Sequence, residues 1–256
     1  MNSTLKGNLI TLGAVAGLVL VWKAVSVLIG SSIILPSPEF TIGTFVEFLK
    51  TGDFWMAVAS TTLRGLVGFF IAVALGIGIG LAAGLNAFIY RLFQPVLTIV
   101  RSTPIMSIIL LALIWFSSGS VPVFVSLLIT FPVITGNVID GIRSSDAELL
   151  EMARLYRVSG GRVMRELILP SILPFVIAGS STAMGLTWKV VVAAEVLSQP
   201  KHAIGTGLFE SKSQLETAGV FAWTLVAIGL SFLFEGLIRL FEKSVSGWKR
   251  EPYTQR

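Results

Sequence analysis

The sequence predicts an all-α membrane protein with about six transmembrane helices, because its composition and the length of its apolar runs both point to this fold class. Apolar residues make up 54% of the 256-residue chain and charged residues only 13%, whereas soluble domains carry about 25% charged residues. The mean hydropathy is +0.86. The apolar runs approach the ~20 residues that a helix needs to span ~30 Å of hydrocarbon. Strands of a membrane barrel would instead be alternating stretches of ~10 residues.

Six apolar runs are long enough to cross a membrane, and we expect one helix in each. They cover residues 9–29, 66–85, 96–116, 121–138, 173–192 and 221–240. The first run contains Lys23 and no clear small-x-small cleavage site, so a span is favoured over a cleaved signal peptide. No linker divides the chain, and residues 1–256 are predicted to form a single transmembrane domain.

We expect a multi-pass protein of the inner (plasma) membrane, and the distribution of Lys and Arg predicts that both of its termini lie in the cytoplasm. In that orientation twelve basic residues lie inside and four outside, while three lie within apolar runs, and an inner excess is the usual bias. The outer segment 35–59 contains Pro36 and Pro38, and a surface helix is expected near 40–49. The second outer segment, 197–219, is rich in glycine, serine and charged residues.

Small residues and one proline are predicted to shape the middle of the chain. Gly76, Gly80 and Gly84 repeat at four-residue spacing, which allows close helix packing. Their partner is either another helix of this chain or a second subunit. Pro104 is expected to bend the third span.

The longest polar interruption, about residues 140–166, predicts a helical cytoplasmic loop. Ser145 followed by Glu148 reads as a capping box that starts a helix. The helix would carry an apolar stripe on one face and place Glu151 beside Arg154 on another. Gly160 and Gly161 are expected to stop or bend it before a second short helix that carries Arg162 and Arg165. The stripe consists of Leu149, Met152, Ala153 and Tyr156.

The same loop resembles the Glu-Ala-Ala loop of permease subunits in binding-protein-dependent ABC importers. Glu151, Met152 and Ala153 stand in the Glu-Ala-Ala positions, and Leu169 and Pro170 close the pattern. The family has a glycine, which permits a tight turn, where this chain has Arg157, so Gly160 or Gly161 is expected to make the turn instead. The resemblance implies that the loop couples to an ATPase through Glu148, Glu151, Met152, Ala153, Arg154, Tyr156, Arg157, Gly160 and Gly161.

Further stretches resemble the nitrate, sulfonate and taurine branch of that family. They are Thr61 to Phe69, Arg101 to Pro104, Ile114 to Phe116, and Trp188 to Glu195. The resemblance implies a type I permease bundle. It also implies a complex with a second copy of the chain, two copies of an ATP-binding cassette ATPase, and a solute-binding protein outside the cytoplasm.

No Gly-Lys dipeptide occurs in the chain, so it has no phosphate loop of its own. ATP and Mg²⁺ are therefore expected on the partner ATPase, and no cofactor, metal or nucleic acid on this chain. No nucleophile, base and orienting group come together, and the lone His202 has no neighbouring ligand set. We expect a transporter subunit in the lipid bilayer rather than an enzyme.

Ionisable residues in or near apolar runs are the candidates for the translocation path: Arg101, Lys189 and Glu195, with Trp188 beside them. Each has an ordinary alternative. Arg101 could snorkel to the interface, Glu195 could be a solvated rim charge, and Lys189 could pair with Glu195.

Unpaired positive charge in the path predicts a small anion or zwitterion as the solute. Substrates of the resembling branch include nitrate, sulfonates, taurine and bicarbonate, but also vitamin precursors of the pyrimidine and flavin type. An ion-driven secondary transporter is the alternative class. It would be expected to carry paired acidic residues in its spans, where only Glu235 is found.

Overall fold

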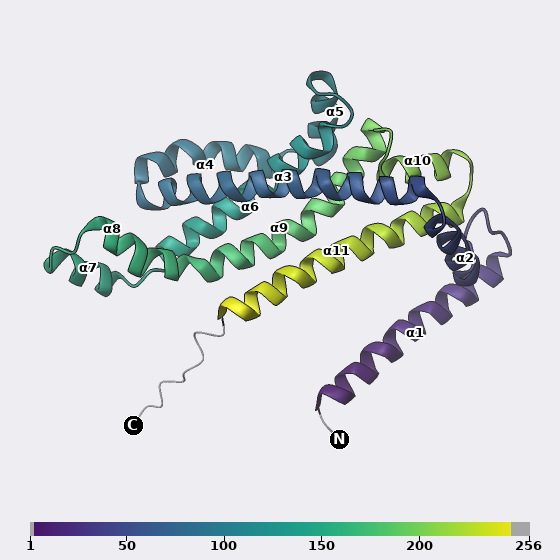
Figure 1. Cartoon of the computed structure of the whole chain (residues 1–256), viewed down its shortest axis with the longest axis horizontal. Coiled ribbons are helices and arrows are strands. Elements are labelled where there is room, and N and C mark those ends of the chain that lie inside the picture. Colours follow the sequence, from purple (N-terminus) through teal and green to yellow (C-terminus); the bar gives the residue numbers. More distant parts are fainter. Residues whose placement is uncertain (1–2, 247–256) are drawn as a thin grey trace.

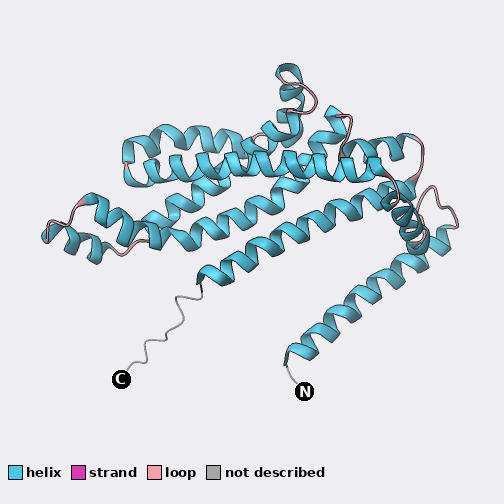
Figure 2. Ribbon diagram, in the orientation of Figure 1, coloured by secondary structure: helices cyan, strands magenta, loops and turns pink. Residues whose placement is uncertain are grey.

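The computed structural model describes residues 3–246, and every regular element in that range is helical (Figure 2). The basic residues Lys249, Arg250 and Arg256, which contribute to the predicted orientation, lie outside the described residues. The helices are α1 (Ser3–Ile29), α2 (Pro38–Leu49), α3 (Gly52–Leu85), α4 (Ala87–Ser102), α5 (Ile105–Trp115), α6 (Val121–Arg143), α7 (Ala147–Leu155), α8 (Gly160–Val163), the π-helical η1 (Met164–Ile168), α9 (Leu169–Ser198), α10 (Ile204–Ser213) and α11 (Thr217–Ser246).

The centre of the bundle is formed by α3, α6 and α9, which pack along one another, with α11 against α9. Figure 1 shows these central helices extending between an end occupied by α7 and α8 and an opposite end occupied by α2 and α10. We call these the α7 end and the α10 end. The helix α1 diverges from the bundle and meets it near α2, where Trp22 stacks on Phe221 with ring centroids 5.4 Å apart.

Helix α2 is the surface helix expected near residues 40–49. Its N-cap is Ser37, whose hydroxyl accepts the Phe40 N–H at 3.3 Å. Lys23 of α1 donates to Glu39 at 2.8 Å, and this hydrogen bond lowers the pKa of the Glu39 carboxyl from its ordinary value. The contact ties the end of α1 to α2.

Glycines bring α3 into close contact with α6. A Cβ on Gly76 would lie 2.8 Å from the Cβ of Ile134, and one on Gly80 would lie 2.6 Å from that of Val138. Gly84 faces Ile142 in the same way. Of the two partners left open by the sequence, the structure places these three glycines against a helix of the same chain.

Five of the six predicted spans each lie within one helix, but the run 96–116 does not. It is divided between α4 and α5, which are bent by 102° at Thr103 and Pro104. Pro104 has no N–H for the helix, and it holds Thr103 in an extended conformation at φ −77° and ψ 130°. The bend expected at Pro104 is confirmed, whereas the expectation of a single helix in this run was wrong. Residues 3–246 contain five helices long and apolar enough to cross a membrane, or six if the bent pair forms one span.

Candidate functional site

The loop helix α7 projects at one end of the molecule (Figure 1) and has no buried residue. Its N-cap is Asp146 rather than Ser145. The Asp146 carboxylate accepts the N–H groups of Glu148 at 2.9 Å and Leu149 at 3.3 Å, while the Ser145 hydroxyl donates to the carbonyl of Gly141 at 3.4 Å. The predicted capping box was wrong by one residue, because a carboxylate close to the positive helix end was available.

The turn after α7 is made by Arg157 itself. Its backbone is left-handed, with φ 52°, and its N–H donates to Arg154 O at 3.0 Å while the Val158 N–H donates to Ala153 O at 2.9 Å. This is a Schellman motif with arginine at the position where glycine is usual. The expectation that Gly160 or Gly161 would take over the turn was wrong: both begin α8, where an added Cβ would meet nothing within 4 Å.

The two faces predicted for α7 are present. The apolar stripe lines a hollow that α7 shares with α8 and η1, whereas Glu151 and Arg154 line a separate depression. Met152 is 49% exposed and Tyr156 79%. The apolar stripe of α7 is therefore left largely uncovered by the rest of the chain.

The loop is continuous with the transmembrane helix α9. Helix α8 passes into the π-helical η1 and then directly into α9. Pro170 lacks the N–H that would bond to the Glu166 carbonyl in a regular helix. The π-helical turn η1 therefore lies where the α-helical hydrogen bonds are interrupted. A displacement of α7 therefore reaches α9 through the four-residue turn at 156–159 and the continuous α8 and η1.

Between α4 and α6 lies a polar cavity of about 440 Å³, which we call the α4–α6 cavity. Arg101 reaches across it, and its Nη2 donates to the carbonyl of Pro132 at 2.5 Å. Gly136 makes this reach possible, because a Cβ there would lie 2.5 Å from that nitrogen. Arg143 lies over the ring of Tyr90, 4.0 Å from its centroid.

Lys189 lies in a different place, in the groove between α9 and α11 together with Glu235. Among the described residues it forms no ion pair, while Glu235 is 3.6 Å from Arg239. Trp188 is only 2% exposed and fills the space between Gly65 and Phe234, so it belongs to the core.

Glu195 is fully buried rather than a solvated rim charge, and it pairs with Arg64 instead of Lys189. Arg64 Nη1 donates to the Glu195 carboxylate at 2.9 Å, and the N–H of Gly205 donates to it at 3.2 Å. The two expectations for Glu195 assumed either solvent or a partner on its own helix. Its partners come from 131 residues earlier in the sequence and from the segment that follows α9.

The same network fixes the start of α10. The Thr61 hydroxyl donates to Glu195 at 2.9 Å and accepts the Ile204 N–H at 2.9 Å, and Arg64 also donates to the carbonyl of His202 at 2.9 Å. The buried pair therefore joins α3, α9 and α10. Thr61 and Arg64 belong to the resembling stretch, but one sequence gives no indication of their partner.

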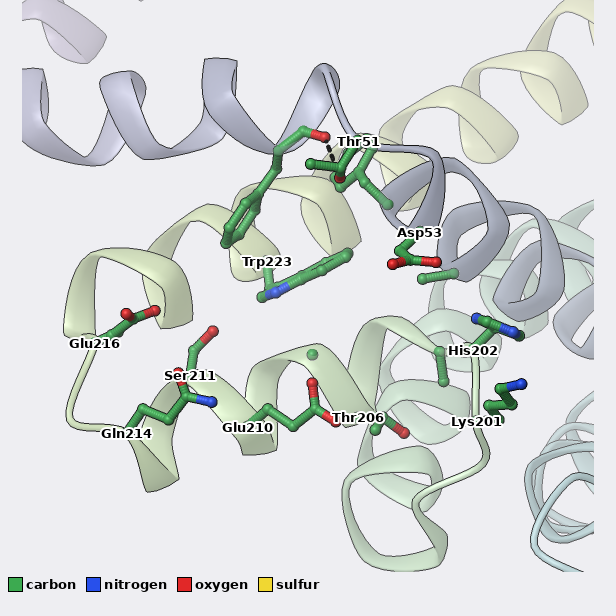
Figure 3. Close-up of a pocket in the computed structure, with 15 residues that line it drawn as sticks. Thr51, Asp53, Lys201, His202, Thr206, Glu210, Ser211, Gln214, Glu216 and Trp223 are labelled. Atoms are coloured by element: carbon green, nitrogen blue, oxygen red, sulfur yellow. Dashed lines mark hydrogen bonds between the residues drawn. The ribbon is translucent and has the colours of Figure 1, made fainter.

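A further pocket of about 530 Å³, the α10 pocket, opens beside α10. Figure 3 shows Asp53, His202 and Lys201 at one side of it, Glu216 and Gln214 at the other, and the Trp223 ring between them. Within the described part of the chain no three ligating side chains gather at a metal site. The sequence indicated only that segment 197–219 was rich in charge.

Comparison with known proteins gives the chain's relatives. The family described as "Binding-protein-dependent transport system inner membrane component" matches residues 72–247. SsuC of Escherichia coli (strain K12), named for aliphatic sulfonates transport, is 33% identical over 91% of this chain and 89% of its own length. The taurine transport permease TauC of the same strain is 25% identical over 94% and 90%. The bicarbonate transport permease CmpB of Synechococcus elongatus is 27% identical over 82% and 79%.

Solved structures share the fold. An amino acid ABC transporter chain superposes with a TM-score of 0.60 at 17% identity, covering 77% of this chain and 98% of its own. The inward-facing MetNI methionine transporter gives a TM-score of 0.53 at 16% identity, over 73% and 93%. At these identities the likeness concerns the fold alone, and the fold is that of ABC importer permeases.

Proposed function

The chain belongs to the family of binding-protein-dependent transport system inner membrane components, and from this membership we propose that it imports a small anion with energy from a separate ATPase. The family makes it the transmembrane subunit of an ABC importer and gives no support to an ion-driven secondary transporter. The ATPase, its ATP and Mg²⁺, and the substrate are parts of the proposal.

The observation that carries the ATPase contact is the exposed apolar stripe of α7. Leu149 is 42% exposed, and Met152 and Tyr156 are more exposed. Helix α7 is capped by Asp146, so the stripe is held on a formed helix. In the proposed complex each of two ATPase copies covers the α7 of one of two copies of this chain. Closure of the ATPases around ATP then moves α7 and, through α8 and η1, the start of α9.

The arrangement along the bundle supports an orientation with both termini in the cytoplasm. The α7 end would then face the cytoplasmic ATPase, and the α10 end the solute-binding protein on the opposite side of the bilayer. The α10 pocket, with its charged rim, lies at the end where a delivered solute would arrive.

The substrate class follows from the relatives and from the charges of the chain. Three relatives are named for sulfonates, taurine and bicarbonate, all of which carry an acidic group. Arg101 lines the α4–α6 cavity and Lys189 the α9–α11 groove. A small anion or zwitterion suits these positive charges better than a vitamin precursor of the pyrimidine or flavin type.

The test is assembly with a candidate ATPase encoded beside the gene. We expect Met152→Asp to abolish co-purification and stimulated ATP hydrolysis, because it puts a charge into the apolar contact. Leu215→Asp is the matched control: Leu215 is 68% exposed next to α10, at the other end of the bundle. Intact assembly in a variant that lacks residues 147–160 would refute the proposed contact.

A further inference from the structure

The α4–α6 cavity is lined by two polar stripes that face each other. On α4 the stripe repeats at nearly one-turn spacing through Tyr90, Gln94, Thr98 and Arg101. On α6 the opposing positions are Gly136, Asn137, Asp140 and Arg143. Most of the long polar side chains of the two helices, all but Arg91, therefore lie on the sides that meet.

Polar stripes of this kind are disfavoured against hydrocarbon, because lipid offers no hydrogen-bond partner. Gln94 and Thr98 are both exposed although they lie in the middle of α4. The cavity is therefore suited to hold water and a polar solute.

Arg101 is positioned in advance for such a solute. The Pro132 carbonyl accepts from one terminal nitrogen of its guanidinium, and Gly136 leaves the space that the group occupies. Among the described residues this is its only hydrogen bond, so other N–H groups of the guanidinium remain available. No carboxylate within the described chain forms an ion pair with it.

The charge of the cavity is positive. Arg101 and Arg143 contribute two positive charges and Asp140 one negative charge, which leaves +1. Arg143 is held over Tyr90, so it stays at the α7 end of the cavity. A guanidinium with free N–H groups in a site of net positive charge favours an oxyanion.

We propose that the α4–α6 cavity is an anion subsite of the translocation path, which takes small oxyanions such as sulfonates or bicarbonate, with Arg101 as the group that contacts them. This inference rests on the proposed import of a small anion. It adds the place in the chain where the anion is held after release from its binding protein.

The chain contains no cysteine, so a single introduced thiol can report on the cavity. We would introduce Thr98→Cys and compare its reaction rate with two methanethiosulfonates in the purified complex with the ATPase, one bearing a sulfonate and one a trimethylammonium group. Ile99→Cys is the matched control, since Ile99 is the next residue on α4, is 64% exposed, and does not line the cavity.

We expect the anionic reagent to react about ten-fold faster than the cationic one at position 98, relative to their ratio with a free thiol. Arg101→Gln should remove this preference, Arg101→Lys should retain most of it, and Lys50→Gln, which removes an exposed charge elsewhere, should leave it unchanged. Methanesulfonate and bicarbonate should slow the labelling more than choline does.

Three results would overturn the inference: a thiol at 98 that reacts no faster than one at 99, no preference for the anionic reagent, or a preference that survives Arg101→Gln. None of them bears on assembly with the ATPase or on α7. Failure of the subsite and failure of the proposed ATP-driven import can therefore be distinguished.

Discussion

Arg64 and Glu195, which lie 131 positions apart, form an ion pair of 2.9 Å with the carboxylate fully buried. Thr61 and the Gly205 N–H complete its hydrogen bonds. A buried charge with all its partners is tolerated, whereas one that loses its partner is not. The pair fixes α9 and the start of α10 to α3.

Removal of one partner should therefore be costly. We expect Arg64→Ala to destabilise the protein by about 3–5 kcal/mol, because it leaves the Glu195 carboxylate buried without its counter-ion. The measurement is thermal unfolding in detergent, followed by size-exclusion chromatography. Lys23→Ala breaks the ion pair with Glu39, whose members are 43% and 66% exposed, and should cost under about 1 kcal/mol. Equal effects of the two substitutions would contradict the structural role of the buried pair.

The close packing of α3 on α6 predicts a contrast between two glycines. Gly80→Ala should destabilise the bundle by about 1–3 kcal/mol, since the new Cβ would lie 2.6 Å from Val138. Gly78→Ala should be neutral or slightly stabilising, because a Cβ there meets nothing within 4 Å and alanine favours helix. Thermal unfolding of the two variants measures the difference. A larger loss of stability in Gly78→Ala than in Gly80→Ala would mean that α3 packs on α6 through its other face.

The left-handed backbone of Arg157 predicts that one substitution at this position stabilises α7 and the turn after it. Arg157→Gly should relieve about 1 kcal/mol of left-handed strain and slow amide hydrogen exchange in α7, whereas Arg157→Val should speed it. Arg154→Gly is the control, because Arg154 lies within α7 and glycine there weakens a helix. Faster exchange in Arg157→Gly than in the native chain would mean that the turn is not the one described.

The proposed ATPase contact predicts unequal roles for two charged residues of the loop. Glu151→Ala should lower ATP-driven uptake several-fold more than Arg162→Ala. Glu151 lies exposed on α7, whereas Arg162 is 3.6 Å from Glu166 within the α8–η1 segment. Uptake into proteoliposomes that contain the whole complex is the measurement. If neither variant matters while Gly160→Pro abolishes uptake, the contact lies further along the loop.

Local patterns in the sequence predicted the helices well, and tertiary partners explain most of the differences. Hydrophobic runs are a property of neighbouring residues, so five spans and α2 could be located from the sequence alone. A bend at Pro104 was expected, but not that the run divides into two helices. The apolar character of a run does not show how strongly a proline within it bends the chain. The N-cap of α7 was predicted one residue too early, because Ser145 and Asp146 are both suitable N-cap residues and only the backbone geometry distinguishes them.

The candidate path residues illustrate the limit for functional sites. Four residues were grouped by charge and by position along a helix, but the structure distributes them among a cavity, a groove, the core and a buried ion pair. Glu195 shows why: its partner Arg64 is distant in sequence, and a single sequence does not reveal long-range pairs. Only Arg101 and Lys189 line open space.

The continuous helix through η1 and α9 has a mechanical consequence. Helix α9 has 30 residues, or about 45 Å of stiff rod, and its far end is bound to α3 by Arg64 and Glu195. A rod that is fixed at one end and displaced at the other rotates about its fixed end. Motion of α7 would therefore be larger around Asn137, which packs against Gly179 of α9 and lines the α4–α6 cavity, than around the α10 pocket. Helix α9 would act as a lever with its fulcrum at the ion pair, so that residues beside the α4–α6 cavity move while the α10 pocket keeps its shape.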